Sequence, residues 1–177
     1  ELRERFGQIK ADQPELFGAG FDYVIHTFET KEIHLLSNPV HRYAKEPVLF
    51  YQMIRLMEEN PGTSVIHTPY AICNSYMYEE LSRLGKKATM MQNSAANNGN
   101  MFAATDYLRH KKDLIHTGVN LLEYEGGISY HGKSVSIGDE LSLVGSFNMD
   151  MRSAYIDTEL MLVVDSESVN RQLRANM

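Results

Sequence analysis

The sequence is poor in cysteine and has no tryptophan: its 177 residues include one cysteine, Cys73. A single cysteine excludes an internal disulfide bond and leaves the redox compartment open. We interpret Cys73 as a small buried apolar residue, the usual setting of a free cysteine. The sequence also lacks cysteine pairs at zinc-site spacing, and its seven histidines form no HExxH pattern. It therefore predicts no metal and no cofactor.

Long apolar runs are missing as well. No stretch of about 18 consecutive apolar residues occurs, so the sequence predicts no transmembrane helix, and it shows no signal peptide. The chain begins at Glu1 instead of a methionine, and residues 2–6 already have a helical pattern. We therefore expect a fragment of a longer protein, and the lack of an anchor here carries no conclusion about that parent.

Positive charge is in deficit, with 17 lysines and arginines against 23 acidic residues and a net charge of −6. This balance argues against generic nucleic-acid binding, which needs a basic surface to neutralise phosphates. An acidic protein can still hold a basic pocket. What the chain does have is a composition typical of a globular domain, with 43% hydrophobic residues, and a length that fits one domain with a sizeable core.

Strand and helix patterns alternate over most of the chain. Residues 1–20 are polar and broken by Pro14 and two glycines, and we expect a loosely packed lead-in there. Runs of β-branched and aromatic residues predict strands at 23–28, 32–36, 63–67, 87–92, 119–124, 129–137, 141–144 and 158–164. Helical periodicity and capping residues predict helices at 45–59, 75–84, 101–116, 148–154 and 166–176. This order predicts an α/β domain with a mixed sheet flanked by helices.

The most informative stretch of the chain runs from His131 to Glu159. His131 and Lys133 are two residues apart, so on a strand their side chains share one face. The sequence Gly-Ser-Phe-Asn at 145–148 indicates a tight bend whose exposed N–H groups suit an anion such as a phosphate. Glu159 lies on the next apolar run, where it could hold the imidazole. These groups are the parts needed to cut or transfer a phosphodiester.

Each of these residues also has a plain structural interpretation. A lone histidine or lysine on a strand is usually structural, Ser146 and Asn148 are ordinary turn and cap residues, and Glu159 could mark an exposed strand end. The Gly138-Asp139 pair is good hairpin chemistry in its own right. Independent coincidence explains the combined spacing poorly, however, so we favour a phosphodiester site.

The spacing resembles the signature of the phospholipase D superfamily: H-x-K, four residues, Asp, six residues, then G-S-x-N. His131, Lys133, Gly145, Ser146 and Asn148 all fall in register, whereas Gly138 occupies the position of the family aspartate. The run at 153–160 is similar to the continuation of the motif in bacterial cardiolipin synthase-like members. The resemblance covers roughly residues 30 to 170.

The resemblance implies a phospholipase D-like lobe over residues 1–177, the C-terminal half of a two-lobe protein. The second H-x-K lobe would come from the missing N-terminal half or from a homodimer partner. One histidine would attack phosphorus to form a phosphohistidine, and the other would protonate the leaving alcohol. We assign His131 to general acid/base catalysis, with nucleophile as the alternative. Lys133 and Asn148 would stabilise charge, Gly145 and Ser146 would bind substrate, and Glu159 would orient His131.

The implied function is hydrolysis or phosphatidyl transfer on phospholipids, of the cardiolipin synthase or phospholipase D type, in a membrane-associated bacterial parent. The acidic net charge makes nucleic acid an unlikely partner. Two alternatives stay open: a nuclease-type phosphodiesterase of the same superfamily, and a catalytically impaired lobe that only scaffolds its partner. Gly138 keeps the second alternative open, although Asp139 could reach round to replace the missing carboxylate.

Overall fold

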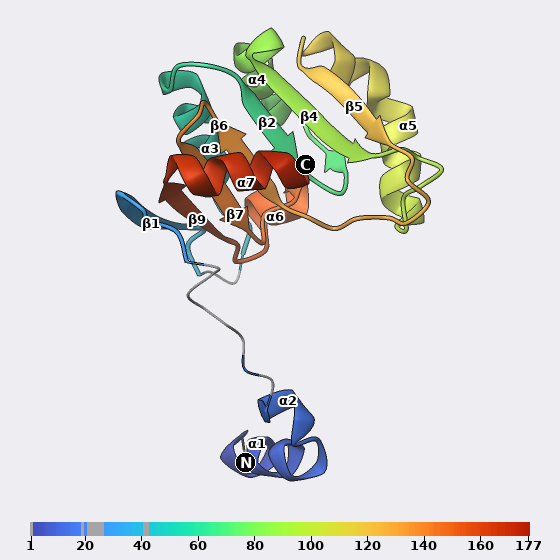
Figure 1. The fold of residues 1–177 in the computed structure, drawn as a ribbon. Helices are drawn as coiled ribbons and strands as arrows, with labels where there is room; N and C mark the ends of the chain where they lie inside the picture. The colour runs from blue at the N-terminus through green and yellow to red at the C-terminus, as the bar shows by residue number, and fades with distance from the viewer. Residues whose placement is uncertain (1, 19, 21–26, 41–42) are drawn as a thin grey trace.

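The computed structural model describes residues 2–18, 20, 27–40 and 43–177 of the chain. Within these ranges a seven-stranded mixed sheet carries helices on both faces, as the alternating pattern predicts (Figure 1). In chain order its strands are β1 (Glu32–Ser37), β2 (Ser64–His67), β4 (Ala88–Asn93), β5 (Asn120–Tyr124), β6 (Ser134–Ile137), β7 (Leu141–Gly145) and β9 (Leu160–Asp165). Two short strands, β3 (Ala71–Ile72) and β8 (Met149–Asp150), form a separate parallel pair.

The strand order in the sheet is β1-β9-β7-β6-β2-β4-β5. Neighbours β2, β4 and β5 run parallel, and the connections between them contain the helices that a parallel crossover requires. The other neighbouring pairs are antiparallel, including the β6–β7 hairpin predicted from Gly138-Asp139. One end of the sheet therefore collects the carboxyl ends of β1, β2, β4, β5 and β7 and the amino ends of β6 and β9; we call it the site end, and its opposite the far end.

The helices form one layer on each face of the sheet. They are α3 (Val48–Glu59), α4 (Ser75–Leu84), α5 (Met101–His116), the short α6 (Met151–Tyr155) and α7 (Glu167–Asn176). Helices α3, α4 and α5 contact one another in succession and cover one face, whereas α7 lies across β6 and β7 on the other (Figure 1). The bounds of α5 match the predicted segment, and α3 ends where predicted but begins at Val48 instead of residue 45, with Pro47 at its N-cap.

The main core lies between the sheet and the α3–α5 layer. Helix α3 buries five apolar residues in it, Phe50 among them, and β6 contributes Val135 and Ile137. Methionine is frequent in this core, because its flexible thioether side chain fills irregular gaps. The buried methionines are Met53, Met57, Met77, Met90, Met149 and Met161. Cys73 is buried as predicted, and burial raises the pKa of its thiol.

The lead-in contains two helices, α1 (Leu2–Asp12) and α2 (Glu15–Gly18), which Figure 1 shows apart from the sheet. The rings of Phe6 and Phe17 meet edge to face, with centroids 5.3 Å apart. Most of the strand predicted at 23–28 lies outside the described residues. No helix of the described ranges combines the length and the apolar character needed to cross a membrane.

Two predicted elements near the motif have other bounds in the structure. The strand expected over 129–137 begins only at Ser134, so His131 and Lys133 precede β6 in an irregular segment. The helix expected over 148–154 is the shorter α6, which follows β8. In both cases side-chain hydrogen bonds from elsewhere in the fold hold the backbone, a tertiary effect that local propensity does not contain.

Candidate active site

The topology brings the motif residues to the site end of the sheet. His131 and Lys133 lead into β6, the bend at 145–148 follows β7, and Glu159 immediately precedes β9. Strands β6, β7 and β9 are consecutive antiparallel neighbours, so the start of β6, the end of β7 and the start of β9 meet at one end of the sheet. Segments separated by 28 residues in the sequence are thereby adjacent in space.

Backbone hydrogen bonds join the bend to its two neighbours. The amide of Gly145 donates to the carbonyl of Lys133 at 3.1 Å, and the amide of Ser146 donates to the carbonyl of Leu160 at 2.9 Å. The Leu160 amide returns a bond to the Ser146 hydroxyl at 3.1 Å. A Cβ on residue 145 would overlap the Leu160 carbonyl oxygen, so only glycine allows β7 and β9 to approach this closely. The two predicted substrate-binding residues, Gly145 and Ser146, thus lie between the H-x-K segment and Glu159.

The carboxylate of Glu159 is 6% exposed and is held by two serines. One oxygen accepts a hydrogen bond from the hydroxyl of Ser146, and the other accepts one from the hydroxyl of Ser153 at 2.7 Å. The structure therefore differs from the expected direct bond between Glu159 and the His131 ring. The reason is that a buried carboxylate needs close donors, and the bend and α6 supply two hydroxyls that the linear motif does not reveal.

The imidazole of His131 instead contacts the other half of its own motif. The Lys133 ammonium lies 2.6 Å from Nδ1 of His131 and donates to the His131 carbonyl at 2.8 Å. Burial, and then the charge of Lys133, lower the pKa of His131, which favours the neutral ring. Burial also lowers the pKa of Lys133, although the negative charges of Glu159 and Asp150 oppose that shift. A neutral imidazole beside an ammonium suits an incoming phosphate oxygen.

Asn148 and Asp150 complete the bend. The amide of Asn148 donates to the Ser153 hydroxyl at 3.2 Å, but within the described residues the buried Oδ1 of Asn148 has no hydrogen-bond partner. Asp150 caps α6 by accepting from the Ser153 amide at 2.6 Å, and burial raises the pKa of the Asp150 carboxyl. Because Oδ1 is an acceptor, a ligand that satisfies it must bring a donor such as an alcohol hydroxyl, and only Nδ2 of Asn148 can donate to a phosphate oxygen.

Asn93 is a site residue that the sequence did not identify. It ends β4 and is 1% exposed. Its Nδ2 donates to the carbonyls of Tyr130 and Pro69, each at 2.9 Å, and its Oδ1 accepts from the Tyr130 amide at 3.1 Å. The side chain of Asn93 thus hydrogen-bonds both the amide and the carbonyl of Tyr130. These bonds keep Tyr130 out of the sheet and fix the segment that precedes His131. The signal in the sequence was an asparagine directly after an apolar strand.

Tyr70 and His67 also lie beside the motif. The ring of Tyr70 faces His131 with centroids 6.4 Å apart, and burial raises the pKa of the Tyr70 phenol. The ring of His67 stacks on Tyr130 at 4.2 Å, and burial lowers the pKa of the His67 imidazole. These aromatic rings form one wall beside the H-x-K segment.

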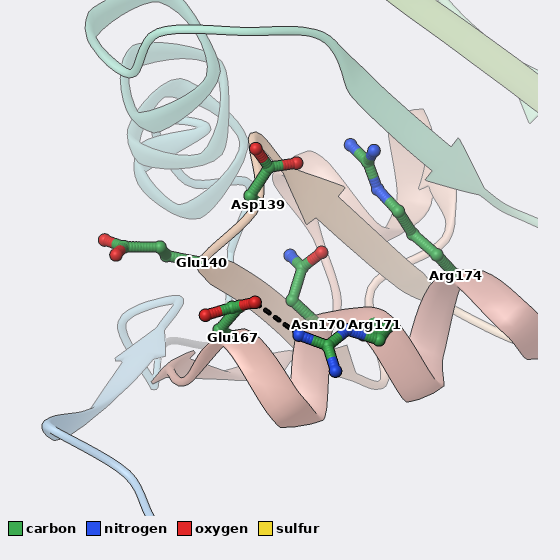
Figure 2. A pocket seen from close by; sticks show the side chains of 6 residues that line it. All are labelled: Asp139, Glu140, Glu167, Asn170, Arg171 and Arg174. Carbon is green, nitrogen blue, oxygen red and sulfur yellow. Dashed lines mark hydrogen bonds and ion pairs between the residues drawn. The ribbon is translucent and has the colours of Figure 1, made fainter.

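Gly138, the residue at the family aspartate position, lies at the far end of β6. Its φ is +53°, its amide donates to the Thr63 carbonyl at 3.0 Å, and a Cβ there would lie 2.8 Å from the Pro61 carbonyl oxygen. Asp139 does not reach round to His131 but lines a far-end cavity of about 360 Å³. The other residues of that cavity, shown in Figure 2, are Glu140, Glu167, Asn170, Arg171 and Arg174. No cluster of three potential metal ligands occurs in the described ranges.

The chain is similar to known proteins in sequence and in fold. The family described as "Cardiolipin synthase, PLD-like domain" matches residues 54–177. Cardiolipin synthase A of Wigglesworthia glossinidia brevipalpis is 42% identical over 62 residues, which are 35% of this chain and 12% of that protein. The match thus spans about an eighth of the curated relative's length.

Solved structures share the fold at low sequence identity. Nuc from Salmonella typhimurium, a phospholipase D family member, superposes with a TM-score of 0.60 at 13% identity, over 82% of this chain and 91% of that one. Phosphatidylserine synthase of Haemophilus influenzae Rd KW20 gives a TM-score of 0.58 at 17% identity, over 81% of this chain and 37% of that one. At these identities the similarity establishes the fold.

Proposed function

The chain belongs to the family of phospholipase D-like cardiolipin synthase domains, and on this premise we propose that it supplies one half of an active site that cleaves or transfers phosphodiester bonds of phospholipids. The observation that carries the proposal is the convergence of the H-x-K segment, the 145–148 bend and Glu159 at one end of the sheet. The named function of the curated relative, cardiolipin synthesis, favours a lipid phosphodiester as the substrate.

In the proposed reaction one imidazole attacks phosphorus, a P–N bond forms, and the P–O bond to the leaving alcohol breaks. A second imidazole gives that alcohol its proton and then removes one from the incoming water or alcohol, which displaces the first imidazole. We place His131 in the acid/base role, with nucleophile as the alternative. The lowered pKa of His131 favours the neutral ring, which is the form that the nucleophile alternative uses. In the acid/base role His131 must carry a proton at the first step, and a bound phosphate anion favours that form because it raises the pKa again.

Charge on the non-bridging phosphate oxygens needs donors. Lys133 offers its ammonium and Asn148 its side-chain amide, and removal of one such donor typically costs about two to three orders of magnitude in rate. Ser146 has its hydroxyl bound to Glu159, so we propose that Glu159 positions the anion-binding bend and not the ring of His131. The charge of Glu159 also favours the ammonium form of Lys133.

The second imidazole is proposed to come from another H-x-K lobe, in the remainder of a longer protein or in a second copy. The chain carries one H-x-K that G-S-x-N follows at the family spacing, and its match covers only 12% of the curated relative. The face of β1, β9 and β7 beyond α7 also supports a protein neighbour, because its apolar side chains are 39–62% exposed. These residues are Ile33, Leu35, Val144, Leu160 and Leu162.

The test is turnover of phosphatidylglycerol and of DNA by the protein as the cell makes it, with wild-type chain and His131→Ala. We expect lipid turnover that falls by about three orders of magnitude or more in His131→Ala, because no other group replaces the imidazole. His116→Ala, on the exposed end of α5, is the matched control and should stay within about twofold.

Three results would contradict the proposal. Cleavage of DNA with no lipid turnover would point to the nuclease alternative. Full activity in His131→Ala would show that this lobe is a scaffold, and equal losses in His131→Ala and His116→Ala would show that the effect is not specific to the motif.

A further inference from the structure

Apolar side chains project from the site end of the sheet. Among the described residues four large apolar side chains are more than four-fifths exposed: Phe102 at 88%, Val40 at 87%, and Met101 and Ile128 at 81% each. Single exposed apolar residues are ordinary on a protein surface. What distinguishes these four is that they all belong to segments at the same end of the molecule as His131. We call them the apolar rim.

Three members of the rim lie in or beside the connection that leads from β5 to the H-x-K segment. Met101 and Phe102 begin α5, directly after its cap Asn100. The loop before this cap is bound to the 125–133 connection, because Nδ2 of Asn97 donates to the Ile128 carbonyl at 3.3 Å. Figure 1 shows the start of α5 beside the connection that follows β5. The same connection continues through Tyr130, which Asn93 holds, to His131.

The fourth member lies on the opposite flank of the site. The Asn38 amide donates to the Glu159 carbonyl at 3.1 Å, and Nδ2 of Asn38 donates to the Ser153 carbonyl at 2.7 Å. Val40 follows two residues later, so it lies near the Glu159 side of the bend. The rim therefore has members on both flanks of the imidazole and the ammonium.

We propose that the site end is a membrane-contact surface, in which the apolar rim enters a phospholipid bilayer and presents a lipid phosphodiester to His131 and Lys133. This inference rests on the proposed function, because it assumes that the substrate is a lipid. Burial of apolar side chains at the acyl boundary is favourable, and at the same time the ammonium of Lys133 meets phosphate at headgroup level. The exposed face of β1, β9 and β7 provides a separate surface for a second lobe, which leaves the rim for lipid.

The test is co-flotation of the wild-type chain and its variants with vesicles of phosphatidylcholine, alone and mixed with phosphatidylglycerol. Met101→Ser/Phe102→Ser removes two rim side chains, and Leu108→Ser/Ile115→Ser removes two exposed apolar side chains from the same helix away from the site. We expect the rim variant to bind vesicles about tenfold more weakly for each side chain removed, and the control to bind within about twofold of wild type. Ile128→Ser, on the other loop, should weaken binding by a similar factor on its own.

The outcomes separate this inference from the proposed function. In one outcome the rim variant loses vesicle binding, His131→Ala keeps it, and the wild type turns over no lipid. This outcome would support the membrane surface and contradict the proposed function. In another outcome the wild type turns over lipid, and the rim variant binds vesicles as well as wild type does. This outcome would support the proposed function and contradict the membrane surface. A rim variant that changes the sedimentation coefficient without lipid, and leaves vesicle binding unchanged, would show that the rim is a protein interface and overturn the inference.

Discussion

The two ends of the sheet are built from the same strands but use their polar groups differently. At the far end the charges are matched within the protein: Nε of Arg174 donates to the Ser136 hydroxyl at 2.6 Å, and Lys31 bonds Glu140 at 2.8 Å. Figure 2 shows the far-end cavity with Arg171 paired to Glu167. A hollow with charged walls is therefore not by itself a site, because both of its arginines already have partners.

At the site end the groups have fewer partners among the described residues. Oδ1 of Asn148 is buried without one, and the exposed imidazole of His131 contacts only the lysine of its own motif and, at longer range, Tyr70. Such groups cost stability unless a ligand completes them. Buried hydroxyls without partners in the described ranges also occur toward the far end, at Ser64 and Ser142. The comparison teaches that this site is recognised by the motif groups that fixed backbone brings together, more than by unsatisfied atoms or by the size of a cavity.

The largest expected contrast is between two glycines, one at each end. Gly145→Ala places a Cβ on the Leu160 carbonyl oxygen, which must push β7 and β9 apart and displace the bend. We expect turnover to fall by about two orders of magnitude or more, since the donors for phosphate move with the bend. Gly138→Ala should cost about 1 kcal/mol or more in the free energy of unfolding, from its φ of +53°, with turnover per folded molecule unchanged.

Denaturant unfolding and turnover per folded molecule measure both glycine variants. A Gly138→Ala protein that folds normally and loses turnover would break the comparison, because it would connect the far end to the chemistry.

Two buried asparagines, each 1% exposed, give the next contrast. Asn93→Ala leaves both backbone groups of Tyr130 without their bonds, and Asn170→Ala leaves the Ser136 hydroxyl without its acceptor. We expect each to lower the free energy of unfolding by about 1–3 kcal/mol. Only Asn93→Ala should also lower kcat, by roughly ten- to a hundredfold, because the segment entering His131 loses its position.

Separate kcat and KM values, together with unfolding curves, test this pair. Asn93→Ser, which keeps a smaller hydrogen-bonding side chain, should recover part of the lost kcat. Equal kcat losses in Asn93→Ala and Asn170→Ala would mean that general destabilisation accounts for both.

The smallest contrast concerns pH. The charge of Lys133 contributes to the lowered pKa of His131, so Lys133→Met should raise the pKa of that imidazole. In the acid/base role the protonated ring is the active form, so activity falls as pH rises through this pKa, and that basic limb of kcat/KM should lie at higher pH in the variant than in wild type. In the nucleophile alternative the neutral ring is the active form, and the acidic limb should lie at higher pH instead. Arg171→Met removes the same charge at the far end and should leave the limb in place.

A pH profile over the acidic range decides this prediction. Coincidence of both limbs in wild type and Lys133→Met would exclude coupling of the two groups. A limb in which activity falls as pH rises would show that the protonated ring is required in the first step.

Much of the fold was predictable because its signals are local. The bounds of α5 and the end of α3 follow from apolar periodicity, and the β6–β7 hairpin follows from Gly138-Asp139. The site was less predictable. Residues 129–133 have strand-like composition, yet Asn93 takes the Tyr130 backbone, and the carboxylate of Glu159 is held by serines instead of the imidazole. The first difference comes from a partner 37 residues away, and the second from side-chain contacts of a bend and a short helix, neither of which periodicity encodes.

By itself the sequence determined which chemical groups the protein carries and how the motif is spaced, because residue identity and local periodicity are written along the chain. The tertiary structure decided which groups meet. The strand order placed β6, β7 and β9 side by side, which brought the bend between the H-x-K segment and Glu159 and left Gly138 at the far end. Strand order depends on long-range packing and pairing, whose free energies are summed over the whole domain and not over any one segment.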